Sequence, residues 1–108
     1  MMMTQTIYLY PQNTQVLTLN GLQDVVTGDY LNQATVTATL IDRLGNVDVV
    51  INDLPLDYLP ASNGNYQGTV PFAFDAALGG GYILQVTANQ AGVQSFFSFP
   101  TIVQLRKQ

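Results

Sequence analysis

The 108-residue chain contains no cysteine, histidine, tryptophan or glutamate, and only three of its residues are lysine or arginine. The lack of cysteine excludes disulfides and thiolate metal sites, and the lack of histidine excludes imidazole ligands and catalysis by a Ser-His pair. Because glutamate and lysine usually fill the exposed faces of helices, their near absence favours an all-β fold. We therefore expect a β protein with no cofactor and no enzymatic activity.

Charged residues make up only 9% of the chain, against about 25% in a typical protein. The net charge is −4, and the basic residues are Arg43, Arg106 and Lys107. Nucleic-acid binding needs several phosphate contacts from lysine or arginine, so we expect no nucleic-acid partner. The polar surface must consist mainly of Gln, Asn, Thr and Ser, and such a surface suits coverage by neighbouring subunits.

Long apolar runs are also missing, and none approaches the roughly 18 residues of a membrane-spanning helix. The first residues, MMMTQTIYLY, have neither a basic region nor a long apolar run, so they do not resemble a signal peptide. A chain of this length forms one domain, here residues 1–108, and buries roughly two thirds of its unfolded surface. We expect a single domain without membrane contact.

The segment 34–41 (ATVTATLI) shows the clearest pattern in the chain, a strict period of two. Successive side chains of a strand point to opposite faces, so one face is threonine-rich and the other carries Ala34, Val36, Ala38 and Leu40. A helix would instead place apolar residues three and four positions apart. The central strand is therefore expected over residues 33–41.

Further short β segments follow at spacings near ten residues, separated by turn signals such as PASNG at 60–64. Proline cannot continue a ladder, so Pro100 is expected to end a strand. This pattern predicts an immunoglobulin-like antiparallel β-sandwich of seven to nine strands. The other expected strands are 6–10, 15–20, 47–51, 54–59, 65–71, 82–89, 93–99 and 101–105.

Seven aspartates are the only acidic residues, and they fall in turns or at strand ends. A catalytic carboxylate pair is formally possible, and Asp24 and Asp29 near Asp53 or Asp75 would offer oxygen ligands to calcium. Aspartate is also favoured in turns because its carboxylate accepts hydrogen bonds from its own backbone. We expect this turn chemistry to account for most of them, with no catalytic and no metal site.

Aromatic residues offer the remaining candidates for a site. Phe96, Phe97 and Phe99 make the last long strand apolar on both faces, which predicts either burial on both sides or a patch that a partner covers. The N-terminal strand is also apolar and can pair with a neighbouring chain. Exposed tyrosines would alternatively stack on sugars. The candidate partner-binding residues are Tyr8, Tyr10, Phe96 and Arg106.

Two segments resemble immunoglobulin-like domains. In 80–86 (GGYILQV), Tyr82 occupies the position of the tyrosine corner, and Leu84 stands where antibody domains have cysteine. Segments 34–47 (ATVTATLIDRLGNV) and 63–71 (NGNYQGTVP) resemble strands of bacterial and phage immunoglobulin-like modules. Tryptophan is absent, so the chain departs from antibody-type domains.

The whole chain resembles small single-domain virion structural proteins of tailed bacteriophages, through Leu9-Tyr10 and the segment 27–40 (TGDYLNQATVTATL). This resemblance implies a capsid decoration or cement protein on the outside of the major capsid lattice. The alternatives are a head–tail connector or tail accessory protein, and a glycan-binding module. The implied partners are the major capsid protein, other virion proteins or further copies of the chain. The implied location is the virion, assembled in the host cytoplasm.

Overall fold

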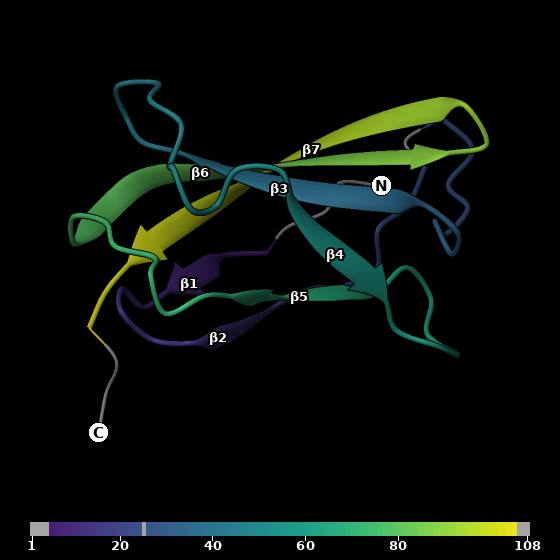
Figure 1. The fold of residues 1–108 in the computed structure, drawn as a ribbon. Helices are drawn as coiled ribbons and strands as arrows, with labels where there is room; N and C mark the ends of the chain where they lie inside the picture. Colours follow the sequence, from purple (N-terminus) through teal and green to yellow (C-terminus); the bar gives the residue numbers. More distant parts are fainter. Residues whose placement is uncertain (1–4, 25, 106–108) are drawn as a thin grey trace.

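The computed structural model describes residues 5–24 and 26–105, and this part of the chain is built from strands without a helix (Figure 1). No segment of these residues is a helix of the length and apolarity that crossing a membrane requires. The described residues form seven strands, and the sequence predicts seven to nine. The strands are β1 (Ile7–Leu9), β2 (Gln15–Leu19), β3 (Thr35–Ile41), β4 (Leu54–Tyr58), β5 (Tyr66–Val70), β6 (Gly79–Gln90) and β7 (Val93–Val103).

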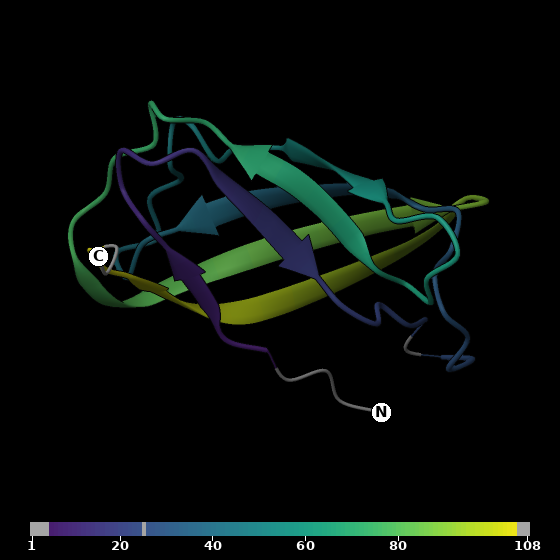
Figure 2. The same ribbon diagram turned by 90° about the horizontal axis from the view of Figure 1, so that it is seen from below.

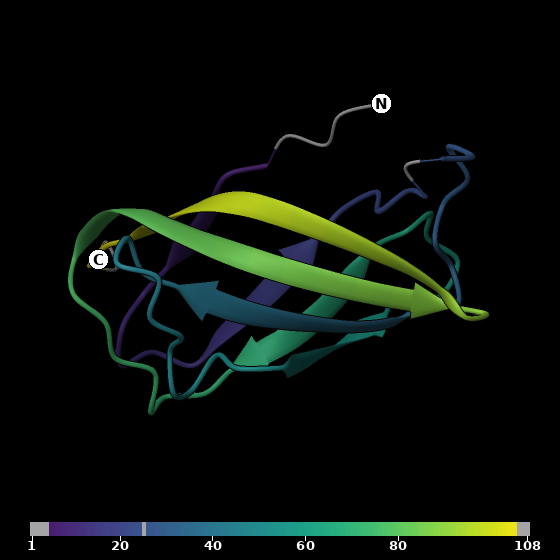
Figure 3. The ribbon, with the colours of Figure 1, turned by 90° about the horizontal axis from the view of Figure 1, so that it is seen from above.

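The strands form one mixed sheet in the order β1-β7-β6-β3-β4-β5-β2. The sheet curls until its two edge strands, β1 and β2, lie side by side, so that it nearly closes into a barrel (Figures 2 and 3). All neighbouring strands run antiparallel except β1 and β7, which are parallel. The expectation of a wholly antiparallel arrangement is therefore wrong at β1.

Alternating side chains build the core, as the sequence predicts. Along β3, Val36, Ala38 and Leu40 are buried, and their register partners on β6 are Ala88, Val86 and Leu84. These side chains belong to one buried apolar cluster that includes residues from all seven strands. The largest fully buried side chains are Tyr66, Phe74, Phe99, Leu9, Leu19, Leu22, Leu40, Ile51 and Leu84.

Strand β4 belongs to both halves of the curled sheet. Its first half pairs with β3 through Leu54 to Leu56, and its last two residues pair with β5. The backbones approach closely beside Gly68 on β5, where an added Cβ would lie 2.6 Å from Pro55 O and 2.6 Å from a Leu56 methyl. Glycine permits this approach because it has no side chain.

The expected strand over 47–51 does not form. Only Val47 makes a bridge, to Ile41, and the carboxylate of Asp48 then accepts the backbone N–H groups of Val50 and Ile51. An aspartate that bonds its own following backbone competes with a ladder, and this turn carries Ile51 into the core.

Pro100 does not end its strand either. Strand β7 runs through Pro100, which lies opposite Ile83 of β6, and pairing with β1 starts one residue later at Thr101. Proline is tolerated where its missing N–H faces no partner. The expected strand 82–89 also starts earlier than predicted, because the three glycines at 79–81 begin β6, with an irregular register between Gly79 and Tyr82.

Candidate functional site

Strand register brings apolar side chains into one line across the outer face of four neighbouring strands. Ile41 of β3 lies opposite Ile83 of β6, Ile83 lies opposite Pro100 of β7, and Tyr8 of β1 lies opposite Ile102 of β7. Pro100 and Ile102 are two positions apart and therefore share a face. Tyr8 is 45% exposed and Ile83 is 43% exposed, while Ile41 and Ile102 are half-buried. We call these five residues the apolar row.

The strands that carry the apolar row contain no charged residue at all: β1, β3, β6 and β7 are built from apolar, glycine, hydroxyl and amide side chains. Their outer surface is here called the uncharged face. These strands add no charge of their own to the cost of burial, although the side chain of Arg43 lies against this face beside Gly81 of β6. Besides the apolar row and Phe96, its side chains include Thr35, Thr37, Thr39, Gln85, Thr87, Asn89, Gln94 and Ser98.

The four candidate residues from the sequence fall in different places. Tyr8 and Phe96 both belong to the uncharged face, and Phe96 is 58% exposed. Since Phe96 lies six positions before Ile102 on β7, the two aromatic residues are about 20 Å apart along the strand. Tyr10 is half-buried beyond the end of β1, and Arg106 lies outside the described residues.

The last strand is buried on one face only. Phe97 and Phe99 point into the core, whereas Phe96 points outward. The interpretation that β7 is buried on both sides is therefore wrong. The sequence could not reveal the apolar row, because each strand contributes only one or two of its members and only the register assembles them.

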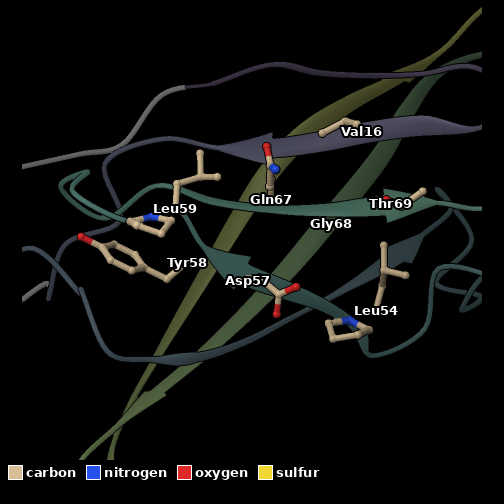
Figure 4. A pocket seen from close by; sticks show the side chains of 10 residues that line it. Val16, Leu54, Asp57, Tyr58, Leu59, Gln67, Gly68 and Thr69 are labelled. Carbon is tan, nitrogen blue, oxygen red and sulfur yellow. The ribbon is translucent and has the colours of Figure 1, made fainter.

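A shallow groove of about 480 Å³ lies on the opposite side of the molecule, over β2, β5 and β4 (Figure 4). Asp57 and Gln67 are register partners on β4 and β5 that line it, together with Val16 and Thr69. The hydroxyl of Tyr58 at its margin already donates to the carbonyl of Ser62. The groove offers one carboxylate, one amide and the hydroxyls of Tyr58 and Thr69, so it lacks the second carboxylate that acid–base catalysis by a carboxylate pair requires.

A second hollow, of about 350 Å³, contains Asp42, Asp48 and Asp75 beside Tyr82. Asp42 accepts the backbone N–H groups of Asn46 and Leu44, and the hydrogen bond from Asn46 is the main reason why the pKa of Asp42 is lowered. Among the described residues, no group of three or more acidic side chains is placed to hold a metal ion.

Turn chemistry is seen for three of the seven aspartates, whereas the sequence predicted it for most of them. Asp24 accepts the backbone N–H groups of Val26 and Thr27, and Asp42 and Asp48 do the same in their own turns. Each carboxylate thereby satisfies backbone donors that a loop would otherwise leave to water.

The hydroxyl of Tyr82 donates to the carbonyl of Ala77, 2.8 Å away and five residues earlier. A bond from a tyrosine back to the preceding backbone is the defining contact of a tyrosine corner. Comparison of the chain with protein-family models, curated proteins and solved structures gives no match.

Proposed function

We propose that the chain is an immunoglobulin-like module of a tailed-phage virion, and that it serves as a capsid decoration protein. The neighbour relations of the strands support the fold assignment. In constant-type immunoglobulin domains one sheet contains strands C, F and G and the other contains B, E and D. Here β3, β6 and β7 are neighbours in that order, as are β2, β5 and β4. The contact between Tyr82 and Ala77 supports the same assignment.

The uncharged face is the observation that carries the functional proposal. Four strands without a charged residue, crossed by the apolar row, form a surface that adds no charge of its own to the cost of burial, and Arg43 beside Gly81 is a neighbouring charge. Its threonines and amides supply hydrogen-bond donors and acceptors to a partner backbone or side chain. A surface of this kind suits permanent coverage by another protein more than it suits turnover of a substrate.

The dimensions of the face favour a partner that offers more than one contact. Four strands at about 4.8 Å spacing and seven residues at about 3.3 Å cover roughly 400 Å², about half of one side of a standard interface. A junction between capsid subunits would supply the missing area from a second subunit. Binding would then occur only on the assembled lattice and would stabilise the shell by mass action.

Cosedimentation with assembled shells of the major capsid protein tests this proposal. Ile83→Lys places a charge within the apolar row and should weaken binding at least tenfold. Val49→Lys is the matched control, because Val49 is 93% exposed and lies outside the uncharged face. Equal binding by both variants would show that this face is not the contact surface.

Imaging of intact particles tests the location. Decoration of the lattice implies hundreds of copies per particle, whereas a connector or tail component implies about a dozen, as expected from particle symmetry. Absence from particles together with binding to a glycan array would replace this proposal with the recognition module.

A further inference from the structure

Within the described residues, side-chain amides and not a backbone ladder join the two edge strands of the sheet. The carboxamide of Gln15 on β2 donates to Tyr8 O at 2.6 Å and accepts from Tyr10 N at 3.1 Å. The carboxamide of Gln5 donates to Thr18 O at 2.9 Å and accepts from Asn20 N at 3.3 Å. We call these four hydrogen bonds the amide seam. Each glutamine takes the place of one peptide group of a missing partner strand.

The strand beside the amide seam is the shortest in the fold. β1 has three residues, and its backbone pairing to β7 spans Ile7 to Leu9, followed by a bond from Gln104 N to Leu9 O. Its side chains nevertheless fill the core, since Ile7 is 4% exposed and Leu9 is fully buried. β1 therefore fills a slot between β7 and β2, and it contributes two apolar side chains to the core.

The connection between β1 and β2 contains a strained backbone position. Gln12 has a φ of 57°, a left-handed conformation that a residue with a side chain rarely adopts. One backbone bond, from Gln12 N to Phe74 O at 2.7 Å, holds this turn against the rest of the molecule. An extended connection between residues 10 and 14 would relieve the strain and lose that bond.

We propose that β1 exchanges between copies of this chain, so that the β1 of one molecule fills the slot between β7 and β2 of another. The occupant is defined by the structure itself, because the slot already holds this segment within one chain. An exchanged β1 would restore the pairing with β7, the burial of Ile7 and Leu9, and the amide seam. Only the turn at Gln12 would differ, so the concentration of protein decides between the closed and the exchanged form.

Mixing two single-cysteine variants tests this exchange, since the natural chain has no cysteine. Tyr8 and Ile102 are register partners on adjacent parallel strands, and both point outward. Their expected Cα separation of about 5 Å lies within the range that a disulfide spans. Tyr8→Cys and Ile102→Cys are placed on separate chains, one of them isotope-labelled, mixed at high concentration, and then oxidised.

Exchange predicts a disulfide between residues 8 and 102 of different chains, identified by mass spectrometry. We expect it to form at least tenfold more often than the disulfide in a control mixture of Tyr8→Cys with Val26→Cys, because Val26 is 88% exposed and lies away from β1. A yield equal to that of the control would overturn the proposal. The double variant with both cysteines in one chain must close internally when dilute, and its failure to close would also overturn it.

A second substitution tests the role of the amide seam. Gln15→Ala removes two of its hydrogen bonds and should raise the rate of intermolecular disulfide formation several-fold. Gln94→Ala, at an exposed position of β7, is the matched control and should leave the rate unchanged. An unchanged or slower rate in Gln15→Ala would show that the seam does not hold β1 in place.

Discussion

The hydroxyl of Tyr66 on β5 donates to the carbonyl of Leu31, a residue that precedes β3 on the other half of the curled sheet. The same hydroxyl accepts the backbone N–H of Ala34 at 3.1 Å. The Tyr66 side chain is fully buried, and its ring lies against Tyr58 with the centroids 5.5 Å apart. One buried oxygen therefore connects the two halves of the sheet through the core.

Tyr66→Phe should lower the free energy of unfolding by about 1–3 kcal/mol, because it leaves the buried carbonyl of Leu31 and the partly buried N–H of Ala34 without their partner. Urea denaturation followed by circular dichroism measures this loss. Tyr30→Phe is the matched control, since Tyr30 is 44% exposed, and it should change stability by less than about 0.5 kcal/mol. Equal effects of the two variants would contradict the role assigned to Tyr66.

Alkaline pH should destabilise the protein through the same residue. Burial raises the pKa of Tyr66 above its ordinary value of 10.0, so the folded state holds the phenolic proton more tightly than the unfolded state. The stabilisation from the neutral phenol is complete below the unfolded pKa, and it is lost as the pH rises through the folded pKa. The thermal midpoint should fall above about pH 10, and the fall should be shallower in Tyr66→Phe. Parallel curves for the two proteins would contradict this assignment.

Gly68→Ala should destabilise the fold by about 1–3 kcal/mol, because its Cβ would press on the Pro55 carbonyl and force the backbones of β4 and β5 apart. Gly80→Ala provides the comparison, since a Cβ at that position meets nothing within 4 Å. Chemical denaturation of both variants measures the difference. A neutral Gly68→Ala would mean that β4 and β5 can separate freely at this point.

Gln15→Glu should weaken the amide seam at neutral pH, because a carboxylate oxygen would then face the carbonyl of Tyr8. The loss should be about 1 kcal/mol in the free energy of unfolding, measured by urea denaturation. Protonation of the introduced glutamate at acidic pH restores a donor toward the carbonyl of Tyr8 and part of the stability. A variant whose deficit relative to the natural chain is the same at pH 7 and pH 4 would contradict this account.

The β architecture could be predicted because it follows from local alternation. In β3 and β6 every second residue is apolar, and the structure buries those residues in the predicted phase. The positions where strands begin and end were harder to predict from the sequence. Asp48 converted a β-favourable segment into a turn, and Pro100 was accommodated because β1 pairs only from Thr101 onward.

The candidate surfaces could be predicted only in part. Exposed aromatic positions on the first and last strands were identified from sequence as Tyr8 and Phe96. The apolar row depends on three separate registers, and the amide seam depends on which two strands become the edges. Neither feature can be recognised from a short stretch of sequence. Glutamines at positions 5 and 15, for example, are also compatible with ordinary solvent-exposed side chains.

The two halves of the curled sheet are joined differently on their two sides. On one flank a single strand, β4, pairs with both halves, whereas on the other flank the described hydrogen bonds between β1 and β2 come from glutamine side chains. A force that separates the two halves of the sheet should therefore break the hydrogen bonds between β1 and β2 first. The two halves would then rotate relative to each other about β4. Resistance to tension in this fold should depend on the direction of pulling.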